Sequence, residues 1–265
     1  MLTFVHMLPS VVRMVNRTDF IASLAKGLRV LECFRAETPR QSVAEAAAAT
    51  GLDRATARRC LLTFTELGYA EYDGKYFQLT PRVLRLGMGA LAALPLPQIV
   101  QPWLDQLSAR TGQSSSVSVL DETDIVYIAR SAATRIMSIG LMPGSRLPAH
   151  CTSMGRVLLG ALPEDEARKW IDRTDLAPRT PRSLTNPDAI MAELAMVREQ
   201  GFSVIDQEVE IGLRSIAVPL YDIRGRIVAA LNLGIAATDA PASELPDRFL
   251  APLREVQSGL QRVLQ

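Results

Sequence analysis

The sequence predicts an α+β protein built in two parts, and three observations support this fold class. Two short helical patterns followed directly by a hairpin pattern occupy residues 42–79, and helical and strand-like segments then alternate irregularly from residue 98 to the end. With 265 residues, of which 48% are hydrophobic, the chain exceeds one average domain and can bury a substantial core. We therefore expect a small N-terminal domain, a connecting helix and a larger C-terminal domain.

The chain opens with an apolar stretch, residues 1–16, in which the only arginine, Arg13, follows the hydrophobic residues. A signal peptide carries its positive charge ahead of the apolar run, so a disordered extension is the better interpretation. The first helix is expected from Ser23, its predicted N-cap, to Phe34.

Two further helices are predicted from the capping residues at their ends. Ser42 followed by Glu45 forms a capping box, and Gly51 supplies the positive φ that ends the helix. Asp53 can cap the next helix, whose apolar residues recur at spacings of three and four and predict one buried stripe of Cys60, Leu61, Phe64 and Leu67.

A hairpin follows, with strands at 69–72 and 75–79 joined through Asp73 and Gly74. Helix, helix and hairpin in this order predict a winged helix-turn-helix domain over residues 17–80, which binds double-stranded DNA. Helical arginines are often only a solvated face, but the hairpin directly behind them favours base and phosphate contacts. The candidate DNA-binding residues are Ser42, Arg54, Thr56, Arg58, Arg59, Thr63 and Lys75.

The charge distribution agrees with this division. Residues 1–95 carry 12 Lys and Arg against 8 Asp and Glu, a net charge of +4, whereas residues 96–265 carry 17 against 20, a net charge of −3. DNA is a polyanion, so only the N-terminal part is expected to contact it.

Residues 81–96 predict a linker helix that begins after Thr80 and is apolar on almost every side. Such a helix must be covered, and pairing with its twin in a homodimer is the simplest solution, because operators of helix-turn-helix proteins usually mirror a protein two-fold axis. The Pro95-Leu96-Pro97 break marks the expected boundary of a third part, residues 97–265.

The C-terminal part reads as a mixture of amphipathic helices and alternating strands, hence α+β with an antiparallel sheet that has helices on one face and room for a small molecule on the other. The expected helices cover 98–111, 152–162, 164–171, 188–200 and 243–264, and the expected strands cover 114–120, 124–130, 136–141, 202–209, 214–221 and 226–236.

Several functional classes lack their motifs. The three cysteines lie far apart, and no P-loop, dinucleotide fingerprint, nucleophile elbow or zinc motif occurs, so we expect no metal, no cofactor and no enzymatic activity. Asp206, Glu208 and Glu210 alternate and could form a metal or acid–base cluster, but a solvated strand face is the favoured interpretation. No segment reaches transmembrane length, which predicts a cytoplasmic protein.

Four stretches carry a family resemblance: 23–34, the winged segment, 144–162 and 206–234. Together they resemble the IclR family of bacterial transcriptional regulators, over nearly the whole chain from Asp19. The most similar subgroup controls aromatic catabolism through the β-ketoadipate pathway and responds to p-hydroxybenzoate, protocatechuate or β-ketoadipate. Its members are mainly activators.

The resemblance implies a GAF-like effector-binding domain at 97–265 and assembly as dimers, often dimers of dimers, on inverted-repeat operators. It also implies a pocket around His150, Thr152, Ser153 and Met154, faced by Asp206, Leu213, Arg214, Ser215 and Asn232. Family members commonly have Gly or Ala where this chain has Ser153 and Met154. The larger side chains should reshape the cavity, which argues against a very small effector such as glyoxylate or pyruvate.

The residues of this region suit an organic acid. The start of the helix at 152 carries partial positive charge and favours a carboxylate, for which Arg135, Arg146 or Arg214 could be a bidentate partner. Ile136, Ile139 and Met154 suit an aromatic ring, and Asp206 a ligand hydroxyl.

Simpler roles stay open. Thr152 could only cap its helix, His150 could be a core residue, and Arg214 could pair with Glu208 or Glu210. Two other classes of protein are also open: an enzyme for small organic acids with an accessory winged domain, and a purely architectural DNA-binding protein.

Overall fold

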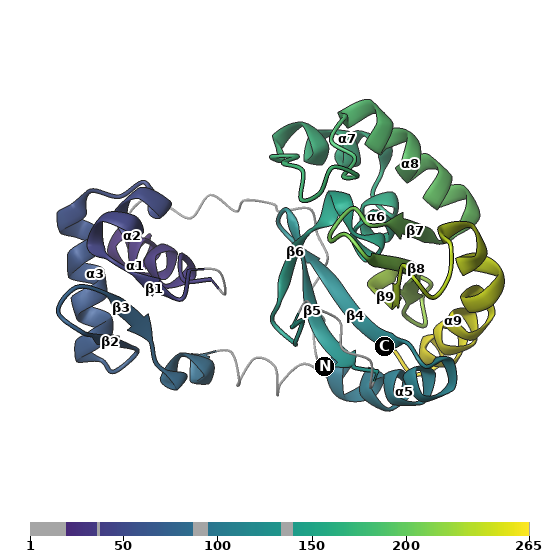
Figure 1. The fold of residues 1–265 in the computed structure, drawn as a ribbon, viewed down its shortest axis with the longest axis horizontal. Helices are drawn as coiled ribbons and strands as arrows, with labels where there is room; N and C mark the ends of the chain where they lie inside the picture. Colours follow the sequence, from purple (N-terminus) through teal and green to yellow (C-terminus); the bar gives the residue numbers. More distant parts are fainter. Residues whose placement is uncertain (1–19, 36–37, 87–94, 134–139, 265) are drawn as a thin grey trace. The chain divides into compact units, whose positions relative to one another are not determined.

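The computed structural model describes residues 20–35, 38–86, 95–133 and 140–264. They form two compact units, one ending at Leu86 and one starting at Pro95 (Figure 1). Three expectations lie partly or wholly outside the described residues: the extension at 1–16, half of the linker helix at 81–96, and most of the strand at 136–141.

The N-terminal unit is a winged helix-turn-helix. Helices α1 (Ala22–Glu32), α2 (Val43–Thr50) and α3 (Arg54–Glu66) pack with a three-stranded antiparallel sheet of β1 (Arg40–Gln41), β2 (Ala70–Tyr72) and β3 (Phe77–Leu79), in the order β1-β3-β2. Val30, Ala46, Leu61 and Phe77 are almost fully buried and bring one residue from each helix and from the hairpin into a single core.

The predicted caps of α2 and α3 are confirmed. Ser42 and Glu45 form both bonds of the capping box, Gly51 ends α2 at φ +67°, and the Asp53 carboxylate accepts a hydrogen bond from the Thr56 amide at 2.8 Å. Two expectations were wrong. The N-cap of α1 is Ile21, not Ser23, and Leu67 is 50% exposed because it lies just past the end of α3.

The expected break at Pro95-Leu96-Pro97 was also wrong as a local structure, because these residues form the first turn of α5 (Pro95–Thr111). Proline fits the first turn of a helix, where its missing N–H has no intrahelical partner. Before it, Pro81–Val83 form a short 3₁₀ helix, η1, capped by the Thr80 hydroxyl.

The C-terminal unit is built on a six-stranded antiparallel sheet in the order β6-β5-β4-β9-β8-β7. Its strands are β4 (Ser114–Asp121), β5 (Asp124–Ser131), β6 (Arg146–Pro148), β7 (Ser203–Asp206), β8 (Leu213–Tyr221) and β9 (Ile227–Ala236). Strand β6, like β1, was missed because two or three residues are too few to show alternation.

Both faces of this sheet are covered by helices. One face packs against α5 and α9 (Leu245–Gln261), the latter preceded by η3 (Ala242–Glu244). The other packs against α6 (Ser153–Gly160), α7 (Glu164–Arg173) and α8 (Pro187–Gln200), with η2 (Ala149–Cys151) leading into α6 (Figure 1). Helices were expected on one face only, with room for a small molecule on the other, but both faces carry them: Leu231 and Ala230, neighbours on β9, point into different apolar layers.

Candidate functional site

The exposed face of α3 carries three arginines. Arg54, Arg58 and Arg59 are exposed, and none pairs with a carboxylate in the described part of the chain. Thr63 is exposed as well, and its hydroxyl donates to the carbonyl oxygen of Arg59 at 2.8 Å. Unpaired cations on a helix of this length suit contact with phosphates and base edges.

Two of the candidate DNA-binding residues have structural tasks. The Thr56 side chain is buried, and its hydroxyl accepts a hydrogen bond from the Arg59 guanidinium at 3.3 Å. This leaves Thr56 little surface to offer DNA but holds Arg59 in place. The Ser42 hydroxyl accepts from the Glu45 amide as the cap of α2.

The wing between β2 and β3 is held by Asp73. Its carboxylate accepts hydrogen bonds from the amides of Tyr76 at 2.7 Å and Lys75 at 2.9 Å, which lower the pKa of Asp73. The Lys75 ammonium lies 4.9 Å from the centre of the Tyr76 ring, and the guanidinium of Arg40 from β1 lies 5.0 Å from the same ring. Arg40 also pairs with Asp73. Lys75 is thus presented on an ordered, cationic turn.

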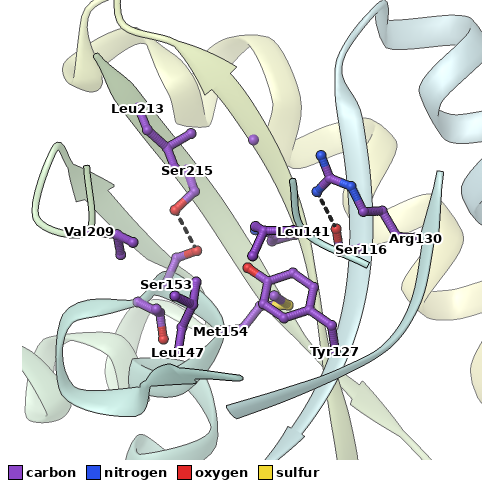
Figure 2. Close-up of a pocket in the computed structure, with 13 residues that line it drawn as sticks. Ser116, Tyr127, Arg130, Leu141, Leu147, Ser153, Met154, Val209, Leu213 and Ser215 are labelled. Atoms are coloured by element: carbon purple, nitrogen blue, oxygen red, sulfur yellow. Dashed lines mark hydrogen bonds between the residues drawn. The ribbon is translucent and has the colours of Figure 1, made fainter. Parts of the chain in front are cut away.

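A cavity opens in the C-terminal unit between the sheet and the first turn of α6, with an empty volume of about 410 Å³, part of it open to solvent. Figure 2 shows the side chains around it. They come from β4, β5, β6, β8 and β9, from the N-cap and first turn of α6, and from the segments that precede β6 and β8. The lining residues are Ser116, Tyr127, Arg130, Leu141, Leu147, Thr152, Ser153, Met154, Val209, Leu213, Ser215, Asn232 and Gly234.

Tyr127 and Arg130 reach this cavity together because of a β-bulge. Tyr127 pairs with Ser118 on β4, whereas Arg130 pairs with Ser116, and the register shifts between Val117 and Ser118. Strict alternation would put residues three apart on opposite faces, but the extra residue of the bulge returns Arg130 to the face of Tyr127.

Arg130 is the only charged residue among those that line the cavity in the described part of the chain. Its guanidinium donates to the Ser116 hydroxyl at 3.3 Å and pairs there with no carboxylate. Burial lowers the pKa of Arg130, but an arginine stays protonated at neutral pH. Burial also raises the pKa of Tyr127 to about 12, so its phenol stays a neutral donor. The cavity therefore offers a cation and donors to an anion.

Further polar groups line the cavity on α6, β8 and β9. The hydroxyls of Ser153 on α6 and Ser215 on β8 share a hydrogen bond of 2.8 Å. On β9, Asn232 lies opposite Ser116 in the strand register, and its Oδ1 is buried with no hydrogen-bond partner among the described residues. These groups can accept from a ligand hydroxyl. Thr152 is used locally, since its hydroxyl accepts from the Gly155 amide as the N-cap of α6.

Three predicted residues do not line the cavity. Arg214 lies between Leu213 and Ser215 on β8, so alternation turns it to the opposite face, where it bonds Asp206 and the carbonyl oxygens of Ala237 and Ala240. Asp206 is engaged by Arg214 and Arg182. His150, on η2, is buried beside Arg156 of α6. Arg130, and not Arg214, is therefore the arginine that lines the cavity. Arg146, the other arginine considered, pairs with Asp121 and Asp124.

Arg135, Ile136 and Ile139 lie outside the described residues. The residues that sequence reasoning missed are Ser116, Tyr127, Arg130, Leu141, Leu147 and Val209. The strand that carries both Tyr127 and Arg130 was predicted, but a bulge leaves no signal in hydrophobic alternation.

The interpretation of Asp206, Glu208 and Glu210 as a solvated strand face was wrong. Strand β7 ends at Asp206, and Gln207, at φ +64°, breaks the alternation. Glu208 is instead buried in an ion pair with Arg156. Within the described ranges, no group of three or more His, Cys, Asp or Glu side chains could hold a metal, and no helix is long and apolar enough to cross a bilayer.

Comparisons with known proteins agree with both units. Residues 23–74 match the IclR helix-turn-helix domain, and residues 88–261 match the bacterial transcriptional regulator IclR C-terminal domain. The chain is 45% identical to the Pca regulon regulatory protein of Pseudomonas putida, over 88% of this chain and 80% of the relative. It is 37% identical to the p-hydroxybenzoate hydroxylase transcriptional activator of Acinetobacter baylyi, over 94% of each chain.

A solved structure resembles the C-terminal unit. The inducer-binding domain of the PobR transcription factor from Acinetobacter, a double mutant in complex with 3-hydroxybenzoic acid, is 33% identical with a TM-score of 0.60. The match covers 63% of this chain and 98% of that domain.

Proposed function

This chain belongs to the IclR family of bacterial transcriptional regulators, and from that premise we propose that it controls genes of aromatic-acid catabolism in response to a hydroxybenzoate. It is a DNA-binding regulator and not an enzyme. Relatives named for the Pca regulon and for p-hydroxybenzoate hydroxylase support the pathway, and the name of the second supports activation.

The observation that carries the choice of effector is Arg130. It is a half-buried cation that lacks a carboxylate partner among the described residues and opens into a cavity otherwise lined by apolar and neutral polar groups. A buried charge is costly unless paired, so a ligand carboxylate that pairs with Arg130 is stabilised. Met154, Leu141 and Val209 suit the ring, and the Ser153–Ser215 pair suits a ring hydroxyl.

The same observation disfavours β-ketoadipate. A dicarboxylate brings two negative charges, but the described lining supplies one cation. The second carboxylate would be desolvated without a partner, at a cost of several kcal/mol. A monocarboxylic aromatic acid fits this charge balance.

We further propose that the DNA-binding residues are Arg54, Arg58, Arg59, Thr63 and Lys75, on an inverted-repeat operator bound by a homodimer or a dimer of dimers. In this proposal residues 17–80 bind DNA, residues 81–96 link the two domains, and residues 97–265 bind the effector, in a cytoplasmic protein. Effector binding would shift the population between two placements of the winged domains, which requires unequal affinity for the two.

Isothermal titration calorimetry of 4-hydroxybenzoate, protocatechuate and β-ketoadipate tests the effector proposal. Hydrogen bonds to charged groups contribute about 1.5–3 kcal/mol, so Arg130→Gln should weaken hydroxybenzoate binding by roughly 10- to 100-fold. Arg146→Gln is the matched control, because Arg146 is an exposed arginine held outside the cavity by Asp121 and Asp124. Wild-type affinity in the Arg130 variant would place the carboxylate elsewhere.

A further inference from the structure

A buried ion pair lies behind the cavity and is no part of its lining. Arg156 on α6 has a side chain only 2% exposed, and its guanidinium donates to Glu208 Oε2 at 2.8 Å and to the His150 carbonyl oxygen at 3.0 Å. Taking two charges out of water is expensive, so such a pair is stable only when its remaining hydrogen bonds are also made. Both partners meet this condition.

Glu208 is held on two further sides. Its carboxylate accepts a hydrogen bond from the Leu184 amide at 2.8 Å, and its carbonyl oxygen accepts from the Ser183 hydroxyl at 2.6 Å. The side chain and the backbone of Glu208 are therefore both fixed, and so is the position of the next residue, Val209, which lines the cavity (Figure 2).

The connection between β7 and β8, which contains Glu208, includes a residue in an unfavourable backbone conformation. Gln207 adopts φ +64°, a left-handed conformation that is unfavourable for a residue other than glycine. Its side chain compensates, since Oε1 accepts from the Gly212 amide at 3.0 Å and Nε2 donates to Asp206 at 3.1 Å. Hydrogen bonds of the Gln207 side chain therefore stabilise this turn, in addition to the ion pair between Glu208 and Arg156.

The ion pair joins two segments that line the cavity. Arg156 lies one turn after Ser153 on α6, and Glu208 directly precedes Val209 in the connection between β7 and β8. We infer that Arg156 and Glu208 are positioning residues that fix the placement of Val209 relative to the start of α6 and thereby set which aromatic acids fit. This inference rests on the proposed function, since it concerns the selectivity of that same cavity.

The test compares two ligands on each variant. Calorimetry with 4-hydroxybenzoate and the longer 4-hydroxycinnamate gives a ratio of affinities, alongside the melting temperature of each protein. Glu208→Gln should lower the preference for the smaller acid by on the order of tenfold, because pocket fit discriminates by such factors. A purely structural role would lower the melting temperature and leave the ratio unchanged.

Two further variants make the test decisive. Glu193→Gln removes the other carboxylate near Arg156, 3.7 Å away and 35% exposed, and should leave the ratio as in the wild type. The double variant Arg156→Met with Glu208→Gln leaves no orphaned charge, so it should fold and still show the shifted ratio.

The outcomes separate the two proposals. If the wild type binds neither acid, the proposed function and this inference fall together. If it binds, but the double variant keeps the wild-type ratio, or Glu193→Gln shifts the ratio equally, the positioning role alone is overturned.

Discussion

At the scale of single residues, His150 is a buried titratable group with a measurable consequence. It is fully buried, and neither ring nitrogen has a hydrogen-bond partner of normal geometry among the described residues. Burial, and then the nearby Arg156 cation, lower the pKa of His150, while Asp175 and Asp124 act in the opposite direction. The neutral imidazole is the form that the folded protein accommodates.

This predicts a loss of stability in mild acid. Because the folded pKa lies below the ordinary value of 6.5, the unfolded chain binds the proton first, so the free energy of unfolding should fall as pH drops through and below about 6.5. Urea denaturation between pH 7.5 and 5 measures this. The chain has only one other histidine, His6, so the histidine contribution is simple to assign.

His150→Phe supplies the comparison. It removes the titratable ring from a site where the described residues offer it no hydrogen bond of normal geometry, so its free energy of unfolding should depend less on pH over this range. Parallel pH profiles for the variant and the wild type would show that His150 titrates equally in both states.

At the scale of elements, α3 and the wing supply different kinds of DNA contact. Arg59 is held by the Thr56 hydroxyl on the helix predicted to lie in the major groove, whereas Lys75 lies on the exposed wing turn. A base contact gives discrimination between sequences, but a phosphate contact gives affinity that depends on salt.

Arg59→Ala should therefore weaken operator binding by about 1–3 kcal/mol and relax sequence preference, while Lys75→Ala should weaken all sequences evenly and reduce the salt slope by about 1. Mobility-shift titrations at several salt concentrations, on operator and scrambled DNA, measure both. Arg110→Ala, an exposed arginine on α5 paired with Glu255, is the control. An Arg59 variant that keeps its operator preference would refute base reading.

At the scale of the whole molecule, exposed apolar surface on α1 is where we expect two copies of the chain to pair on DNA. Phe20, Ile21, Leu24 and Leu28, on and just before α1, are 48–63% exposed and follow helical spacing. Large exposed apolar stripes mark interfaces, and a two-fold pairing here would match an inverted-repeat operator.

Replacing Leu24 and Leu28 with Glu should disrupt this pairing and weaken binding to a two-half-site operator at least about tenfold, which corresponds to about 1.4 kcal/mol. Binding to an isolated half-site should be nearly unchanged, since α1 is not the reading helix. Met196→Glu, an equally exposed apolar residue on α8, is the matched control. Unaltered two-site binding by the α1 variant would remove α1 from the interface.

The amino-acid sequence alone determined the elements whose signals are local. The capping box of Ser42 and Glu45, the left-handed Gly51 and the turn at Asp73 and Gly74 each depend on neighbours within a few residues, so the winged domain could be predicted closely. Six residues named through family resemblance also line the cavity: Thr152, Ser153, Met154, Leu213, Ser215 and Asn232.

Only the tertiary structure decided which charge enters the cavity. The bulge opposite Val117 and Ser118 brings Arg130 to the face of Tyr127, alternation on β8 turns Arg214 away, and Arg156 buries Glu208 behind the wall. These outcomes depend on strand register and on contacts between residues far apart in the chain. Hydrophobic periodicity records which segments become strands, but it does not record how their registers align, and the register selects the side chains that face one another.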